Sequence, residues 1–328
     1  MNNCIRFPLL RFGALLLATL FATSSALAAF PERPVKIIVP FAPGGGTDLV
    51  ARTLGIVMAQ ELGQPVVIDN KPGGGTIIGT DALAKSPPDG YTLVMATLAH
   101  AVNPSIQPKL PYDHKSAFTP VMLVGRSPNV LVVRADSPLL SVKDVIAAAK
   151  AKPGRLSYAS QGAGTSAHLA GELFKNLTAT FITHIPYRGA GPALTDLLGG
   201  QVDMMFATAA AAGAFVESGK LKALAVTTAE RSPATMLSKT PTVAESGVPG
   251  YVADSWYGLF APAGTPAAVI ARLNAAARRA AQSEVFRRKV EAEGLVVSAG
   301  TPEEFGRYVA AEEQRWLKVI RAANITID

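Results

Sequence analysis

Residues 35–48 read VKIIVPFAPGGGTD, and their pattern indicates the fold class of the chain. Its first five residues are mostly apolar and β-branched, which is typical of a buried strand. Three glycines then lead into apolar positions that repeat at the 3.6-residue period of a helix. We therefore predict a strand over 35–39, a glycine-rich loop, and a helix over 48–62 with Thr47 as its N-cap.

The alternation of strands and helices continues along most of the chain. Strands that alternate with helices at this spacing indicate parallel β-α-β units with right-handed crossovers. Further strands are expected over 65–69, 91–96, 156–160, 179–185, 202–206 and 221–227, and further helices over 77–85, 141–152, 166–176, 190–198, 209–218 and from 301 onward. The sequence therefore predicts an α/β protein.

This alternation is interrupted by two extended stretches that are not followed by a helix of the repeating pattern, 121–133 and 251–261. We interpret them as extended hinge crossings between two lobes. The expected division is a signal peptide over 1–28, lobe 1 over 29–126 plus 254–328, and lobe 2 over 127–253. Such an architecture fits a hinged binding protein with a cleft, and it also fits many two-domain enzymes.

Composition excludes several classes of protein. The chain has 328 residues, 49% of them hydrophobic, which is too apolar for a disordered chain. One cysteine excludes a disulfide framework and a CxxC redox pair, and four histidines disfavour a histidine-rich metal site. The net charge is +7, but the basic residues are scattered, so we expect no nucleic-acid partner.

The N-terminus has the pattern of a secretory signal peptide. Arg6 and Arg11 precede an apolar run over 13–22, and Ala26 and Ala28 supply the small residues of a cleavage site. We expect cleavage after Ala28 and export to a bacterial periplasm, where the mature chain would have no cysteine. A permanent N-terminal membrane anchor is the alternative.

Two glycine-rich loops each follow a strand and precede a helix, at 40–48 and 70–76. Glycines expose backbone N–H groups, and a helix start adds roughly half a positive charge, so each loop can bind an anion. A plain tight turn is the alternative for one loop, but it does not explain both. The candidate ligand-binding residues here are Pro43, Gly44, Gly45, Gly46, Thr47, Asp48, Gly73, Gly74, Gly75 and Thr76.

A third loop over 160–168 belongs to the second lobe. Gly162 and Gly164 match a loose dinucleotide fingerprint, but no acidic residue follows at the ribose-binding position, so NAD binding is disfavoured. The loop suits a carboxylate instead. Its candidate residues are Ser160, Gly162, Gly164, Thr165 and His168, with Arg188 as a charge at the same rim.

Two more residues are candidate cleft liners. Thr97 follows the third strand, and Asp203 belongs to a strand of the second lobe, where it would favour a ligand with a cationic or hydroxyl group. The sequence contains neither a G-x-S-x-G elbow nor an H-E-x-x-H pair. We therefore expect no catalytic residues, no metal and no cofactor.

The motifs taken together resemble those of the Bug family, the periplasmic receptors of tripartite tricarboxylate transporters. The resemblance covers nearly the whole mature chain. It is carried by residues 39–48, 70–75, 160–168, 186–189, 200–203 and 256–262.

This resemblance implies a two-lobe, Venus-flytrap receptor that is not an enzyme and that captures a small carboxylate. It also implies that the loops at 44–48 and 73–76 hold one carboxylate and the 160–165 loop the other end. The implied partners are the ligand and membrane transporter subunits, and we expect a monomer. The alternatives are a nucleotide-dependent oxidoreductase on the same architecture and a sensory receptor for a membrane kinase.

Overall fold

The structure is a computed structural model that describes residues 30–107, 109–291 and 294–325. The expected signal peptide, residues 1–28, lies outside the described residues. Within the described ranges, no helix combines the length and the apolar character needed to cross a membrane.

Lobe 1 is built on a six-stranded sheet in the order β11-β4-β10-β3-β1-β2. Its strands are β1 (Val35–Val39), β2 (Val66–Asn70), β3 (Thr92–Thr97), β4 (Phe118–Ser127), β10 (Ser255–Pro262) and β11 (Val296–Val297). Its helices are α2 (Gly46–Leu62), the short 3-10 helix η1 (Gly74–Thr76), α3 (Ile77–Ala84), α4 (Leu98–Ile106), α9 (Ala267–Gln282), α10 (Glu284–Glu291) and α11 (Pro302–Ala322).

Lobe 2 is built on a five-stranded sheet in the order β7-β6-β8-β5-β9. Its strands are β5 (Asn129–Arg134), β6 (Ser157–Ser160), β7 (Thr183–Pro186), β8 (Met204–Thr208) and β9 (Leu221–Val226). Its helices are α5 (Val142–Ala151), α6 (Ser166–Thr178), α7 (Ala190–Leu198), α8 (Ala209–Glu217) and the 3-10 helix η2 (Thr235–Leu237).

Both sheets are mixed, with antiparallel pairs besides the expected parallel β-α-β units. The β-α-β units do pair in parallel, β1 with β2 and β3, and β6 with β7 and β8. The strands next to the hinge pair antiparallel: β10 lies between β3 and β4, and β5 lies between β8 and β9. These strands enter a sheet from the other lobe and therefore run against its direction.

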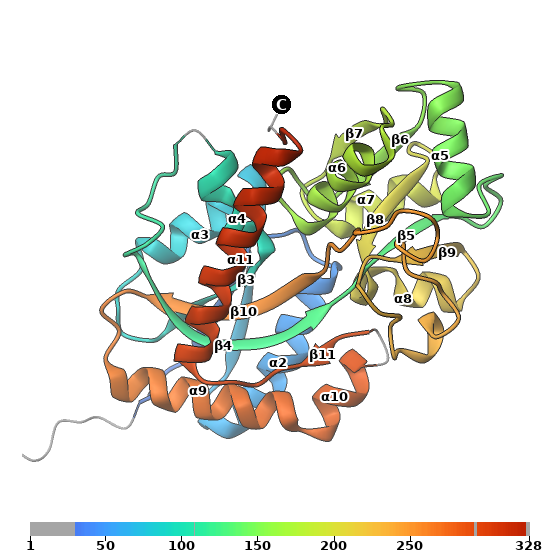
Figure 1. The fold of residues 1–328 in the computed structure, drawn as a ribbon. Helices are drawn as coiled ribbons and strands as arrows, with labels where there is room; N and C mark the ends of the chain where they lie inside the picture. Colours follow the sequence, from blue (N-terminus) through green and yellow to red (C-terminus); the bar gives the residue numbers. More distant parts are fainter. Residues whose placement is uncertain (1–29, 108, 292–293, 326–328) are drawn as a thin grey trace, which may run out of the picture.

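Two extended segments connect the lobes, as the sequence indicated. Only Pro128 separates the end of β4 from the start of β5, and the chain returns to lobe 1 at Ser255, where β10 begins. In Figure 1, β4 and β10 run side by side through the centre of the molecule toward lobe 2. Residues 127–129 and 252–255 therefore form the hinge.

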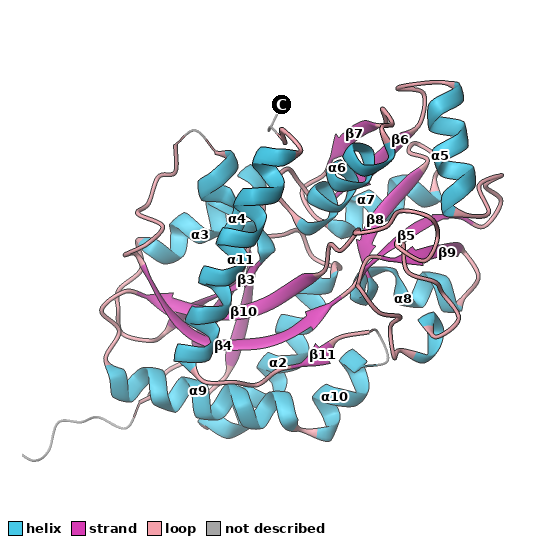
Figure 2. Ribbon diagram, in the orientation of Figure 1, coloured by secondary structure: helices cyan, strands magenta, loops and turns pink. Residues whose placement is uncertain are grey.

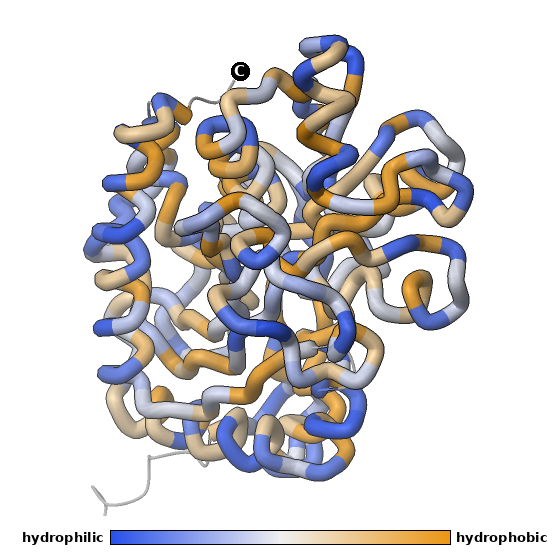
Figure 3. Tube along the Cα trace, turned by 45° about the vertical axis from the view of Figure 1, so that its right-hand side comes forward, coloured by the Kyte–Doolittle hydropathy of each residue, from blue (hydrophilic) through white to orange (hydrophobic). Residues whose placement is uncertain are grey.

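Helices cover both faces of the lobe 1 sheet (Figure 2), with α11 and α9 both packed against β4. The inner strands are buried, whereas the edge strands β2, β7 and β11 are partly exposed. The surface helices alternate between hydrophilic and hydrophobic positions (Figure 3). Thr301 and Glu304 form the capping box that starts α11, as their spacing predicted. A packed core on each side of the sheet makes each lobe a stiff support for its loops.

One local prediction was wrong, and one helix was not predicted. The helix of the opening stretch begins at Gly46 with Gly45 as its N-cap, so Thr47 is already helical. The segment after β3 contains the helix α4, which the sequence pattern did not indicate because Pro104 lies inside it. This proline is tolerated within the helix, and α4 packs against α11.

Candidate functional site

The first glycine loop is held in place by the carboxylate of Asp48. This carboxylate accepts hydrogen bonds from the Gly44 N–H at 3.0 Å, from Arg52 Nε at 2.9 Å and from Asn70 Nδ2 at 2.9 Å. Burial raises the pKa of Asp48, but the hydrogen bonds from Arg52, Gly44 and Asn70 outweigh burial, and the pKa lies below its usual value. Asp48 therefore organises the loop as an anion, and its role as a ligand contact stays a prediction.

The second glycine loop has a backbone that few residue types adopt. Gly73, Gly74, Gly75 and Thr76 have φ values of 123°, 58°, 58° and 82°. Positive φ is a genuine outlier for a β-branched residue such as Thr76, and such strain persists only when the surroundings enforce it. Here Asn103 Nδ2 donates to the Gly75 carbonyl at 3.0 Å and to Thr76 Oγ1 at 3.3 Å.

The third loop, between β6 and α6, uses its hydroxyl groups internally. Thr165 Oγ1 donates to the Gly162 carbonyl at 2.6 Å, and Ser160 Oγ accepts from the Gly162 N–H at 3.1 Å. Both side chains are fully buried. A hydroxyl has one proton to donate, so Thr165 cannot also donate to a ligand. In the structure these two hydroxyls shape the loop, and their contact with a carboxylate stays a prediction.

His168 supports the same loop from behind. Its Nδ1 accepts from the Gly164 N–H at 3.1 Å, and its ring stacks on His184 with centroids 4.3 Å apart. His184 Nε2 lies 2.7 Å from Ser160 Oγ. Burial, together with the nearby His168 and Lys175, lowers the pKa of His184 to about 3. His168 is only 3% exposed, so in this structure it supports the loop and does not line the cavity.

The loops of the two lobes touch one another. The Ala42 N–H donates to the Arg188 carbonyl at 2.9 Å, which is a main-chain hydrogen bond between lobes. Gly75 lies so close to Ala163 that a Cβ there would collide with the Ala163 carbonyl oxygen. A Cβ at Gly164 would lie 2.9 Å from Asn103 Oδ1. The three glycine-rich loops therefore lie together, as the sequence predicted.

Two cavities lie between these loops and share Gln161. The larger, of about 390 Å³, is lined by Pro40, Pro72, Gly73, Gly74, Gly75, Thr76, Ile78, Gln161, Gly162, Ala163, Pro186, Tyr187 and Arg188. The smaller, of about 10 Å³, is lined by Phe41, Gly45, Gly46, Thr47, Gln161, Ala190 and Thr208. A volume of 300–1,000 Å³ is usual for small-molecule sites, so the larger cavity fits a small ligand.

Several predicted site residues do not line these cavities. They are Pro43, Gly44, Asp48, Thr97, Ser160, Gly164, Thr165, His168 and Asp203. Asp203 lies far from the loops, because it precedes β8 at the amino end of the strand, where its carboxylate accepts from the Ser157 N–H at 2.8 Å. Its prediction as a cleft liner is therefore wrong.

Gln161 and Thr208 line the site but were not predicted from the sequence. Both are at least nine-tenths buried, with 9% and 3% exposure. Thr208 ends β8 and is the N-cap of α8, and its hydroxyl makes no capping hydrogen bond. Its position at the carboxyl end of a buried strand was the one signal that could have revealed it. Gln161 stands among the glycines of the third loop without any distinguishing pattern.

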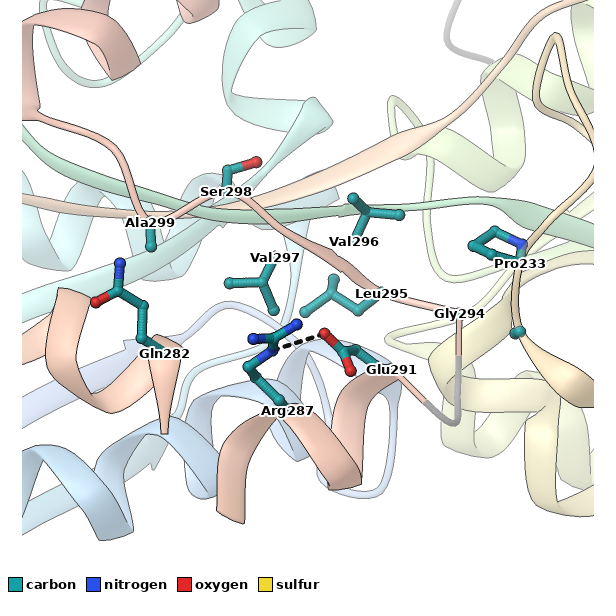
Figure 4. A pocket seen from close by; sticks show the side chains of 11 residues that line it. Pro233, Gln282, Arg287, Glu291, Gly294, Leu295, Val296, Val297, Ser298 and Ala299 are labelled. Carbon is teal, nitrogen blue, oxygen red and sulfur yellow. Dashed lines mark hydrogen bonds and ion pairs between the residues drawn. The ribbon is translucent and has the colours of Figure 1, made fainter. Parts of the chain in front are cut away.

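Larger hollows lie outside the loops. One of about 550 Å³ lies where Pro233 and Ala234 of lobe 2 face α10 and β11 (Figure 4). Its charged residues Arg287 and Glu291 already pair with each other at 2.9 Å. Another of about 600 Å³ lies on lobe 1 beside the start of α11. Neither contains any of the glycine-rich loops, so size alone does not identify the site.

The interlobe site offers neutral donors rather than charged ones. Among the residues lining its two cavities, Arg188 alone carries a charge, and it is exposed. Helix starts leave backbone N–H groups without partners inside the helix, and they attract anions. Among the described residues, no group of three or more His, Cys, Asp or Glu side chains could hold a metal ion.

The two lobes, the paired crossings and the interlobe site define a periplasmic-binding-protein architecture. The family described as tripartite tricarboxylate transporter family receptor (TctC) matches residues 50–325. BugT of Bordetella pertussis is 40% identical over 310 residues, covering 92% of this chain and 94% of BugT. The chain therefore belongs to the TctC family, to which the Bug proteins belong, and it is a solute-binding protein rather than an oxidoreductase.

Solved structures agree with this assignment. The R. palustris protein Rpa4515, solved with adipate, is 38% identical, with a TM-score of 0.87 over 90% of this chain and 99% of that one. MatC (Rpa3494) from Rhodopseudomonas palustris, solved with bound malate, is 35% identical, with a TM-score of 0.85 over 89% of this chain and all of that one. The expected two-lobe fold is thereby confirmed.

Proposed function

We propose that this chain captures a small carboxylate in the periplasm and delivers it to the membrane subunits of a tripartite transporter. The observation that supports this proposal most is the convergence of three glycine-rich loops, from both lobes, on two cavities that share Gln161, the larger of about 390 Å³. The similar proteins solved with adipate and malate fit the same ligand class.

In this proposal the backbone N–H groups of residues 73–76 bind one end of the acid, and residues 45–47 line the small cavity beside it. The third loop, at residues 161–163, and the rim residue Arg188 bind the other end. Residues 160, 164, 165 and 168 act indirectly, because they fix the third loop. The chain acts as a monomer, divided into lobe 1 (29–126 plus 254–328) and lobe 2 (127–253), after cleavage behind Ala28.

The test begins with a thermal-shift screen against mono- and dicarboxylates, followed by titration calorimetry. A ligand at a hundred times its dissociation constant stabilises the protein by about 2.7 kcal/mol, which is readily detected. If none of the acids raises the melting temperature, the carboxylate assignment fails.

A matched pair of variants tests the site itself. Gly75→Ala places a methyl group against the Ala163 carbonyl and hinders the contact between loops, so we expect affinity to fall at least tenfold. Gly63→Ala has a similar positive φ of 70°, at the end of α2, but no atom lies within 4 Å of its Cβ. It carries the same backbone penalty and should bind normally. Equal affinities in the two variants would show that the contact between Gly75 and Ala163 is not needed.

A further inference from the structure

Two buried polar atoms in the interlobe site lack hydrogen-bond partners. Within the part of the chain that the structure describes, neither Gln161 Oε1 nor Thr208 Oγ1 has one. Leaving a buried polar group unpaired costs about as much as losing a hydrogen bond, so native proteins rarely tolerate it without a reason. At a binding site, a ligand group that pairs with both atoms is such a reason.

The two side chains line the same small cavity, next to Gly46 and Thr47. A Cβ at Gly46 would lie 2.7 Å from Thr208 Oγ1, so only glycine avoids a collision with this hydroxyl. Gln161 also lines the larger cavity, so its side chain is common to both cavities.

The size of the small cavity limits which group can enter it. Its volume of about 10 Å³ is close to the minimum that holds one water molecule. A carboxylate does not fit, whereas a single hydroxyl group does. The larger cavity remains for the carbon chain and the carboxylate groups.

The hydrogen-bonding groups that line the small cavity favour a ligand hydroxyl over other small ligand groups. A ketone oxygen can only accept, so it would leave Gln161 Oε1 unpaired. An ammonium group is charged, and no lining residue of the small cavity is acidic. The nearby Asp48 carboxylate already accepts from Gly44, Arg52 and Asn70. A hydroxyl can donate to Gln161 Oε1 and accept from Thr208 Oγ1 at once.

We propose that Gln161 and Thr208 select a hydroxylated organic acid over the same acid without the hydroxyl. This inference rests on the proposed carboxylate-binding function and adds the ligand's second functional group. Gln161 and Thr208 would be specificity residues, while the backbone of the glycine-rich loops would bind the carboxylate common to both acids.

The experiment uses pairs of acids that differ by one hydroxyl: propionate and lactate, succinate and malate, glutarate and 2-hydroxyglutarate, adipate and 2-hydroxyadipate. Each hydroxy acid is tested as both enantiomers by titration calorimetry with the mature protein. For the chain length that fits, we expect one enantiomer to bind at least tenfold more tightly than its partner acid.

Thr208→Val keeps the shape of the side chain and removes the hydroxyl. We expect the hydroxy-acid preference to fall about fivefold or more, and to disappear when Gln161→Met is added. The acid without the hydroxyl is the reference in each variant, so the ratio of the two affinities measures the preference separately from any general loss of binding, and the melting temperature of each variant reports whether it is folded. The control is Thr53→Val, a buried threonine whose hydroxyl donates to Leu49 within α2. It should keep the full preference.

The outcomes separate the inference from the proposed function. Equal binding of both acids of every pair would overturn the inference, because water would then satisfy Gln161 and Thr208, but carboxylate capture would stand. A preference that survives in the double variant would also overturn it. If no acid of either kind binds, the proposed function fails, and the inference fails with it.

Discussion

The side-chain amide of Asn129 donates a hydrogen bond to the carbonyl oxygen of Ala253 at 3.1 Å. These residues belong to the two chain crossings, so one fully buried side chain joins both crossings of the hinge. The oxygen of the same amide accepts from Ser166 Oγ at 3.2 Å, in the first turn of α6. Asn129 thereby connects the hinge to the helix that carries the third loop.

Asn129→Ala should therefore destabilise the protein. It leaves the Ala253 carbonyl without its side-chain donor and removes a buried amide, which should lower the free energy of unfolding by about 1–3 kcal/mol. Differential scanning calorimetry of the ligand-free protein measures the change. Asn176→Ala is the control, because Asn176 is exposed on α6, and its effect should stay within about 0.5 kcal/mol. Similar melting temperatures for the two variants would contradict this role.

Asp48→Asn should weaken ligand binding by disturbing the first loop. An amide cannot accept from Gly44, Arg52 and Asn70 as a carboxylate does, because one of its two ends carries hydrogens. We expect a loss of about 1–3 kcal/mol in stability and about a tenfold loss of affinity for whichever acid the screen identifies. Differential scanning calorimetry measures the change in stability, and titration calorimetry measures the change in affinity.

The control for Asp48 is Glu284→Gln. Glu284 pairs with Arg288 on the surface of α10, where both side chains are more than two-thirds exposed. Surface pairs of this kind contribute little, about 0–1 kcal/mol. If the Asp48 variant binds its acid as tightly as this control does, the carboxylate of Asp48 does not organise the loop.

The stability of the protein should fall as the pH falls from 7 to 5. Burial, with a smaller effect of His114, lowers the pKa of His100 to about 3. A histidine in the unfolded chain has a pKa near 6.5. Between pH 6.5 and pH 3 the unfolded state therefore binds more protons than the folded state, and a lower pH favours unfolding. The stabilising effect of neutral His100 is fully present above pH 6.5 and is lost as the pH falls toward 3.

His100→Leu tests this pH dependence. The ring of His100 lies among Phe118, Phe260 and His114, so an apolar side chain suits the site. Between pH 7 and pH 5, the free energy of unfolding of the variant should fall by about 2 kcal/mol less than that of the wild type. Melting temperatures measured across this pH range give the slope. A slope identical to that of the wild type would mean that His100 does not stay neutral in the folded protein.

The backbone features of the site could be predicted from the sequence. Glycine runs between strand and helix patterns indicate exposed N–H groups, and the structure brings the loops around Gly45, Gly75 and Gly162 together. Such features depend on local chain geometry, which a single stretch of sequence encodes.

The roles of individual side chains could not be predicted in the same way. The hydroxyl of Thr165 donates to its own loop, and Asp203 precedes β8 at the amino end of the strand. Gln161, Thr208 and Asn103 became site residues only through tertiary contacts between distant segments. Sequence spacing gives the position of a residue along the chain, but not the direction of its side chain after the lobes have packed.

The hydrogen bond between Ala42 and Arg188 has a consequence for how such receptors diversify. Both of its atoms belong to the main chain, so substitution of either side chain leaves the donor and the acceptor in place unless proline replaces Ala42. Mutations at Gln161 or Thr208 can then alter which acid is accepted while this contact between lobes persists. Ligand preference and lobe closure can therefore evolve separately, which suits one scaffold to many nutrients.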